Sequence, residues 1–494
     1  MKSSRLELLC NCRVRGYTDA VNSDPLVPLR PIFERVSRVV AVWLCAGLIY
    51  SVVFGSLGLR WGYVILDLVA LTAGLWVVHR CWTSTTTTFR LWLFIAAFSI
   101  ALLMVVGFVI HDRAGVWLDE TEYLKTLRHG FIVRRGTLPF NLRWLEPVLA
   151  GPLNVFPAKD SDALKACNFA ALATTSAELV LLLVRLGVLQ KLAIAAPIFL
   201  LCSYLGTYSA ENRLALDPFN YLLFVLILDA MLAAHYRVLS GLLLLAAFNT
   251  EKVIYWVPVI LTTILLAGSP PCGLPELRRA LVTTLRLSAP TLLYLALLFV
   301  YVHGSAVDDT GPFVEQLHRL AITPTWAKIE DPVALITTPQ MLWFPFGTLT
   351  IYALLSLRSI ERRYAAIVLL LPPVLGQVLV AHDAQRMVAY SFIVYIPLAC
   401  LYLTRALGEM PRALANASLC VFIALPLLLT FLIPLCRLAS DRGIGFVHPV
   451  LHLQRAIRLG LEASELMSLG AFIWLDLVIF SRRAVREVRA DVVT

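Results

Sequence analysis

The stretch from Leu91 to Ile110 reads LWLFIAAFSIALLMVVGFVI and contains no charged residue. An α-helix rises about 1.5 Å per residue, so a stretch of this length can cross the roughly 30 Å hydrocarbon core of a bilayer. Similar apolar stretches recur along the chain, separated by short polar segments. The sequence therefore predicts an all-α protein built from membrane-spanning helices.

The composition of the whole chain supports this prediction. Of its 494 residues, 59% are hydrophobic and only 15% are charged, and the mean hydropathy is +0.79. Soluble domains carry charge on roughly a quarter of their residues. So few charges cannot cover a water-exposed surface of this size, which means that much of the surface must face lipid. We expect one membrane domain without a separable soluble part.

The apolar stretches predict a polytopic bundle of about fourteen spans. We expect residues 1–38 to form a cytoplasmic N-terminal segment, 39–480 the transmembrane domain and 481–494 a cytoplasmic basic tail. The stretches that begin near Val238 and Val253 are short, and they could be one broken helix or two helices that cross incompletely. The spans are expected to begin near Val39, Gly62, Leu91, Ala163, Leu192, Pro218, Val238, Val253, Leu287, Thr338, Tyr364, Met387, Ala413 and Leu466.

The basic residues predict the orientation of the chain. With the N-terminus in the cytoplasm, almost every cluster of arginines falls on the cytoplasmic side, as the positive-inside rule expects. The predicted outer loops are then 111–143 and 304–337. The net charge of +10 thus serves topology, and no aromatic-interleaved basic patch suggests nucleic acid as a partner. The excess of Arg over Lys favours a bacterial inner membrane.

The predicted outer face carries the chemically interesting residues. The segment WLDETEY, from Trp117 to Tyr123, opens a pattern with apolar residues at near-helical spacing, which predicts an amphipathic helix along the outer interface after the third span. Carboxylates at such a position often cap a helix, and arginines at span ends often reach the interface as anchors. Charged residues at the other outer helix ends are Arg143, Glu146, Arg213, Asp217, Glu251, Lys252, Asp383 and Arg386.

Carboxylates together with fixed cations suit one kind of reaction at a membrane surface. A carboxylate can take a proton from an acceptor hydroxyl, while Arg and Lys hold a phosphate leaving group. This is the arrangement expected for transfer of a sugar from a polyprenyl-phosphate carrier, because the cations stabilise the charge that develops on the phosphate.

Four motifs in their order resemble the GT-C superfamily of membrane glycosyltransferases, which contains protein O-mannosyltransferases and lipid A aminoarabinose transferases. WLDETEY resembles the paired acidic motif of that family's first outer loop, and LALDPFNYLLF, at residues 214–224, is similar to its Asp-Pro segment. AAFNTEKVIYWVPVI, at 246–260, and HDAQRMVAY, at 382–390, resemble later elements. The sequence departs from the family at 142–152, where LRWLEPVLAGP replaces a His-Pro-Pro-like element, and in having two additional spans before the acidic loop.

The resemblance implies roles for individual residues. Asp119 would be the general base, and Glu120 would orient it; together they could hold Mg²⁺ or Mn²⁺ through oxygen ligands. The donor would be a polyprenyl-phosphate sugar in the membrane lipid, and the acceptor a glycan, lipid or protein. The residues expected to bind substrate are Arg143, Arg213, Asp217, Lys252, Asp383 and Arg386.

Other functions also fit the sequence. A transporter or flippase of lipid-linked or anionic substrates would explain the broken-helix pattern, although such a protein should carry ionisable residues near the membrane midplane. A polysaccharide polymerase or ligase, or an inactive scaffold, would also use a polytopic framework.

Overall fold

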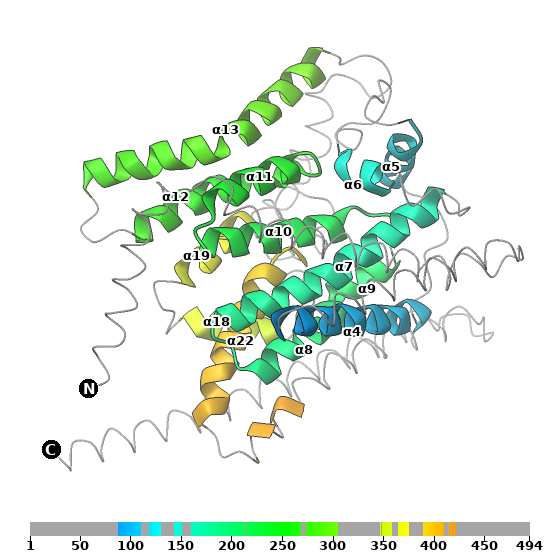
Figure 1. The fold of residues 1–494 in the computed structure, drawn as a ribbon, viewed down its shortest axis with the longest axis vertical. Helices are drawn as coiled ribbons and strands as arrows, with labels where there is room; N and C mark the ends of the chain where they lie inside the picture. The colour runs from blue at the N-terminus through cyan, green and yellow to red at the C-terminus, as the bar shows by residue number, and fades with distance from the viewer. Residues whose placement is uncertain are drawn as a thin grey trace, which may run out of the picture.

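The computed structural model describes residues 87–109, 118–129, 143–150, 160–211, 213–267, 273–304, 346, 348–357, 364–374 and 389–409, and part of 413–420. Figure 1 shows that this part of the chain is a bundle of helices, and no strand occurs among the described residues. The prediction of an all-α protein is therefore confirmed for this part of the chain.

The helices follow one another with short connections. The first are α4 (Thr87–Val109), α5 (Leu118–His129), α6 (Leu145–Ala150), α7 (Asp160–Arg185), α8 (Gln190–Leu201), α9 (Tyr204–Glu211) and α10 (Asp217–Leu232). They are followed by α11 (Tyr236–Ala247), the 3₁₀-helix η4 (Glu251–Tyr255), α12 (Trp256–Ala267), α13 (Leu274–Gly304), α18 (Thr348–Ser356), α19 (Ala365–Val368) and α22 (Phe392–Glu409).

Helix α7 lies in the middle of the bundle. It packs against α4 and α8 and also against α10, which in turn packs against α11, and α11 packs against α13 (Figure 1). Fully buried residues of α7 include Leu164, Leu179 and Leu182. Because this helix is both apolar and surrounded by other helices, it forms the core around which the described helices assemble.

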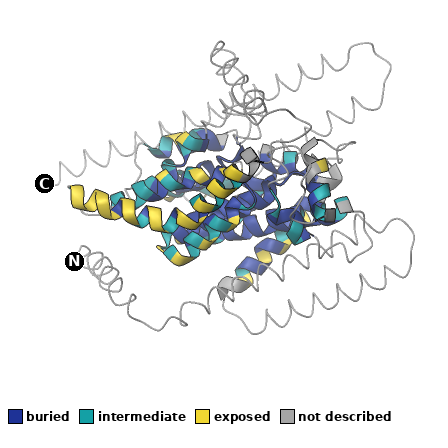
Figure 2. Cartoon of the chain, turned by 90° about the horizontal axis from the view of Figure 1, so that it is seen from above, coloured by how far each residue is buried: buried dark blue, intermediate teal, exposed yellow. Residues whose placement is uncertain are grey.

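Helix α13 has the opposite environment at the edge of the bundle. Only 17% of the most apolar stretch of α13 is buried inside the bundle, whereas 89% of the corresponding stretch of α7 is buried. Figure 2 shows exposed residues on the outer helices and buried residues in the interior. A helix that exposes so much apolar surface suits a lipid environment. The large apolar side chains exposed on α13 are Leu274, Leu277, Leu281, Val282, Leu285, Leu293, Leu297 and Val300.

In the described part of the chain, two helices are long and apolar enough to cross a membrane: Ser161–Arg185 and Leu274–Leu298. Shorter apolar helices occur within α4, α8, α11 and α22. Helix α13 begins 13 residues before the predicted span near Leu287, because Arg278, Arg279 and Arg286 interrupt the apolar run but remain in the helix. The predicted total of spans, the N-terminal segment, the loop after Gly304 and the basic tail lie wholly or largely outside the described residues.

The chain breaks between α11 and α12, as one of the sequence alternatives predicted. Helix α11 ends at Ala247, and after three non-α-helical residues the chain forms the single 3₁₀ turn η4 before α12 starts at Trp256. Thr250 has an extended backbone, and its hydroxyl accepts a hydrogen bond from the backbone N–H of Lys252, which caps η4. This break leaves backbone and side-chain polar groups inside the bundle, where they form the candidate site.

Candidate functional site

Asp217 opens helix α10 at one end of the bundle. Pro218 follows it in the first turn, where a missing N–H costs nothing and the fixed φ suits the helix. The carboxylate is 2% exposed, and the hydroxyl of Tyr390 donates a hydrogen bond of 2.5 Å to its Oδ1. The first turn of a helix favours a negative charge. The local sequence thus explains why an ionised carboxylate can be kept at this buried position.

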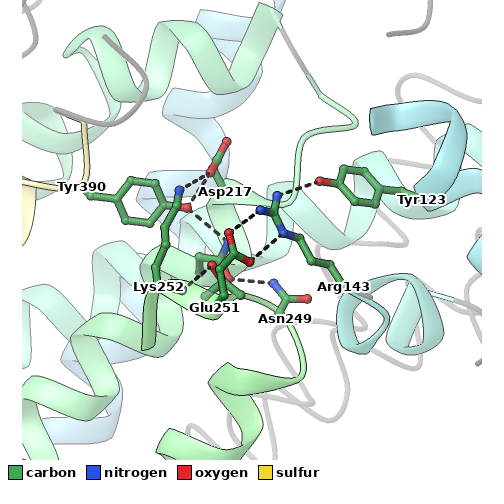
Figure 3. Close-up of polar contacts among 9 residues, drawn as sticks. Tyr123, Arg143, Asp217, Asn249, Glu251, Lys252 and Tyr390 are labelled. Atoms are coloured by element: carbon green, nitrogen blue, oxygen red, sulfur yellow. Dashed lines mark hydrogen bonds and ion pairs between the residues drawn. The ribbon is translucent and has the colours of Figure 1, made fainter. Parts of the chain in front are cut away.

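Lys252 provides the positive charge opposite Asp217. It lies in η4 and is 8% exposed, with its Nζ 3.9 Å from Asp217 Oδ1. The same Nζ lies 3.9 Å from the centroid of the Tyr390 ring, which makes a cation–π contact (Figure 3). A buried ammonium is costly unless it is paired. Asp217 and Tyr390 together compensate for the burial of Lys252.

Two buried asparagines connect this pair to the break after α11. Asn220 Nδ2 donates to the Tyr390 hydroxyl at 3.2 Å, and Asn249 Nδ2 donates to Asn220 Oδ1 at 2.8 Å. The Oδ1 of Asn249 in turn accepts the backbone N–H of Glu146 at 3.1 Å. Helices α6 and α10 and the turn just before α22 are therefore joined through one chain of hydrogen bonds that passes through the break.

A second ion pair lies beside the first. The guanidinium of Arg143 binds both carboxylate oxygens of Glu251, with Nη2–Oε1 at 2.6 Å and Nε–Oε2 at 3.2 Å, and its Nη1 donates to the Tyr123 hydroxyl at 3.3 Å. Figure 3 shows both ion pairs in one cluster. The Arg143 side chain is 13% exposed and the Glu251 side chain 53%. Water therefore reaches Glu251 but hardly reaches Arg143.

The two charges of this ion pair shift each other's proton affinity. Burial by itself would raise the pKa of Glu251, but the charge and hydrogen bonds of Arg143 outweigh burial and lower that pKa below its usual value. Burial would lower the pKa of Arg143, and Glu251 together with Tyr123 raises it instead. Both groups are therefore ionised across the physiological pH range.

Three of the six predicted substrate-binding residues meet in this cluster: Arg143, Asp217 and Lys252. They come from the segment before α6, from α10 and from η4, which are distant in sequence. Glu251 makes its ion pair with Arg143, and Lys252 makes its ion pair with Asp217, because adjacent residues on a helical turn point in different directions.

The other predicted residues are placed differently. Asp119 and Glu120 lie in the first turn of α5, four and three residues before Tyr123, and their side chains are outside the described part. Arg213 lies between α9 and α10, where its Nε donates to the Ala210 carbonyl at 2.8 Å. Asp383 and Arg386 are outside the described residues.

The sequence did not identify several members of the cluster, which include Tyr123, Asn220, Asn249 and Tyr390. Tyr and Asn occur at many structural positions, so they give little signal without a spatial context. Two of them did have a signal: Tyr123 ends the motif WLDETEY and Tyr390 ends HDAQRMVAY. In both motifs only the charged residues were singled out, whereas the tyrosines make the described contacts with Arg143 and Asp217.

An aromatic cluster borders the second ion pair. The ring of Trp144 stacks on Phe248 with centroids 4.7 Å apart, and Phe248 meets Tyr294 edge-on at 4.6 Å. Trp144 Nε1 donates to the Tyr294 hydroxyl at 3.1 Å, and the Phe248 carbonyl accepts the N–H groups of Trp144 and Leu145. These contacts fix Arg143 against the break between α11 and η4.

Within the described residues, no group of three or more His, Cys, Asp or Glu side chains could hold a metal ion. The side chains of Asp119 and Glu120, the predicted ligands of Mg²⁺ or Mn²⁺, lie outside the described part of the chain, so the metal site remains a prediction.

The cluster as a whole offers two fixed cations, two carboxylates and several hydroxyl and amide groups at the end of a helical bundle. Such a set can bind an anionic group through the cations while a carboxylate accepts a proton. No known protein-family model matches this sequence, and no curated protein matches it, so its function has to be inferred from the chemistry of this site.

Proposed function

We propose that this protein is a polytopic membrane enzyme that transfers a sugar from a polyprenyl-phosphate carrier to an acceptor hydroxyl on the outer face of a membrane. The full bundle would have about fourteen spans with both termini in the cytoplasm, and a bacterial inner membrane suits its arginine-rich composition. The acceptor would be a glycan, a lipid or a protein.

One observation carries this proposal. Arg143, Asp217 and Lys252 lie in separate parts of the sequence, yet they form one cluster of paired charges with Glu251 beside them (Figure 3). Buried ion pairs seldom add much stability compared with apolar residues of the same size. A buried ion pair next to a half-exposed one, both beside a helix break, is therefore better explained by binding than by stability.

In this proposal the two cations contact the phosphate of the donor. Glu251 is half-exposed, so an incoming phosphate could replace it as the partner of Arg143 at little desolvation cost. Lys252 would stabilise the charge that develops when the bond from the sugar to the phosphate breaks. Asp217 would hold Lys252 in place between turnovers.

The acceptor side of the reaction belongs to α5. Asp119 would take the proton of the acceptor hydroxyl, and Glu120 would orient it or share a divalent cation with it. Tyr123 follows one helical turn later and binds Arg143. Helix α5 also packs on α6 and α7. The contact of Tyr123 with Arg143 supports a role for the start of α5 at this cluster. Arg213, Asp383 and Arg386 remain candidates for further contacts with the donor.

The test uses the full-length protein in lipid nanodiscs with a panel of polyprenyl-phosphate sugars. Wild type should release polyprenyl phosphate from one donor. Asp119→Asn should slow that release by about 10²–10⁴-fold, the usual contribution of a general base. Lys252→Arg should retain more activity than Lys252→Met, because it keeps the charge. The exposed Lys191→Met is the matched control and should be as active as wild type.

If Asp119→Asn and Lys252→Met both released sugar at the wild-type rate, that result would contradict the proposal. The same would hold if no donor in the panel were cleaved by well-folded wild type.

A transporter is the second candidate, and the break between α11 and α12 favours it, because transporters often bind substrates where helices are interrupted. Uptake of an intact lipid-linked or anionic substrate into proteoliposomes, unchanged by Asp119→Asn and without sugar release, would favour this function over glycosyl transfer.

A further inference from the structure

Glu146 is an acidic residue for which the proposed reaction has no role. It lies in the first turn of α6 and is 0% exposed. Both of its carboxylate oxygens lack a hydrogen-bond partner among the described residues, although its backbone N–H is bound by Asn249. Nearly all buried polar side chains in proteins have a partner. An ionised carboxylate in this position would be very costly.

The described helices that pack around Glu146 supply no positive charge that compensates its carboxylate. Asp217 of α10 acts on it electrostatically with the same sign of charge, and Cys167 of α7 is also close enough to interact. Helix α5 packs on α6 as well, and its buried titratable side chain, Tyr123, bonds to Arg143. Glu146 thus lies on the acidic side of the cluster.

These surroundings favour a proton on Glu146. Burial first, and repulsion by Asp217 second, raise the pKa of Glu146 well above its ordinary value. A protonated carboxylic acid carries no charge, so its burial costs far less than burial of the ion.

The protonation state of Glu146 decides the net charge of the whole cluster. Arg143 and Lys252 are balanced by Glu251 and Asp217, so the four paired groups cancel. With Glu146 neutral, an incoming anion meets no excess negative charge. With Glu146 ionised, the cluster carries one negative charge in a region from which water is largely excluded, where charges interact strongly.

We propose that Glu146 is a proton-binding residue that controls anion binding at this site: the protonated form admits a phosphodiester headgroup, and the ionised form repels it. The identity of the anion rests on the proposed function, whereas the proton on Glu146 does not. Glu146 acts through the charge of the cluster and is therefore a positioning residue.

The first measurement concerns the proton alone. The infrared difference spectrum between wild type and Glu146→Gln at neutral pH should contain the band of a protonated carboxyl group, and its absence would overturn the proposal. Stability gives a second, ligand-free readout. Because the folded pKa is raised, the stability of wild type relative to Glu146→Gln should be highest below pH about 4.3, the unfolded value. It should then decline until the pH passes the folded pKa.

The second measurement concerns the anion. A short-chain prenyl methyl phosphate and dimethyl phosphate each carry one charge that does not titrate in this range, and the pair distinguishes a lipid headgroup from a free phosphodiester. Wild type should lose affinity for the prenyl probe by up to about tenfold per pH unit above the folded pKa of Glu146. Glu146→Gln, which stays neutral, should bind with the same affinity at every pH.

An equal alkaline loss of affinity in wild type and Glu146→Gln would overturn the proposal. If Glu146→Gln does not fold, Glu146→Asp provides the comparison, because it keeps the acid and should keep both the carboxyl band and the alkaline loss. Anion binding that depends on Glu146 in a protein that cleaves no sugar donor would support this proposal and reject the proposed function.

Discussion

Replacing Lys252 with methionine should destabilise the protein more than replacing any exposed lysine. Methionine has a similar length and volume but no charge, so the substitution isolates the ion pair and the cation–π contact. At 3.9 Å from Asp217, a unit charge interacts with about 4 kcal/mol at an effective dielectric constant of about 20. Desolvation offsets part of this in the native protein, but the loss of Lys252 leaves Asp217 buried without its counter-charge.

Breaking a buried pair in this way typically costs 3–5 kcal/mol, and we expect a loss of about 3 kcal/mol because Tyr390 still donates to Asp217. The assay is reversible unfolding in mixed micelles of a mild detergent and SDS, followed by helical circular dichroism. Lys191→Met, at an exposed lysine, is the control and should change the free energy of unfolding by no more than about 0.5 kcal/mol.

The double variant Lys252→Met with Asp217→Asn separates charge from packing. If the loss comes from the uncompensated carboxylate, the neutral amide should recover about 1–3 kcal/mol of it. A double variant that is as unstable as the sum of the two single variants would refute the pairing of these residues. So would a Lys252→Met protein as stable as the Lys191→Met control.

Three further substitutions test the rest of the cluster by the same unfolding assay. Tyr390→Phe keeps the ring but removes the hydroxyl that binds Asp217, and should cost about 1–3 kcal/mol; a loss below about 0.5 kcal/mol would contradict the hydrogen bond. Glu251→Gln should cost at most about 1 kcal/mol because Glu251 is half-exposed. Since Arg143 lowers the pKa of Glu251, the advantage of wild type should be present above pH about 4.3 and vanish as the pH falls through the lowered folded value. Asn249→Ala removes the link between α6 and α10 and should lower stability by about 1–3 kcal/mol, with no change expected if that amide faced water instead.

The two ion pairs differ in a way that bears on function. The pair of Asp217 and Lys252 is nearly closed to water, whereas the pair of Arg143 and Glu251 is open on the side of Glu251. An anion can therefore reach Arg143 by competing with one half-exposed carboxylate. Asp217 and the Tyr390 ring hold the ammonium of Lys252 in place, so the anion has to come close to Lys252 before the two interact strongly.

The helix break is the clearest case in which sequence and structure agree. The segment from Val238 to Gly268 was too short for two ordinary spans and too interrupted for one. Polar residues at 249–252 marked the interruption, and the structure has its 3₁₀ turn immediately after Thr250. Helix α13 is the opposite case. Its arginines interrupt the apolar run, so the sequence predicted a span that begins only near Leu287, whereas the helix already begins at Leu274. Backbone hydrogen bonds maintain a helix regardless of the charge of its side chains.

The sequence by itself determined the helical class, the apolar character, the start of α10 at Asp217 with Pro218, and the interruption before Lys252. Each of these follows from local properties: hydrophobicity, helix-start chemistry and polar residues within an apolar run. Only the tertiary structure decided which charges meet, because partners such as Arg143 and Glu251 are 108 residues apart in the sequence. No local pattern encodes a contact of that range; it arises where the segment before α6 meets the break after α11, through the hydrogen bonds of Trp144 and Leu145 to the Phe248 carbonyl.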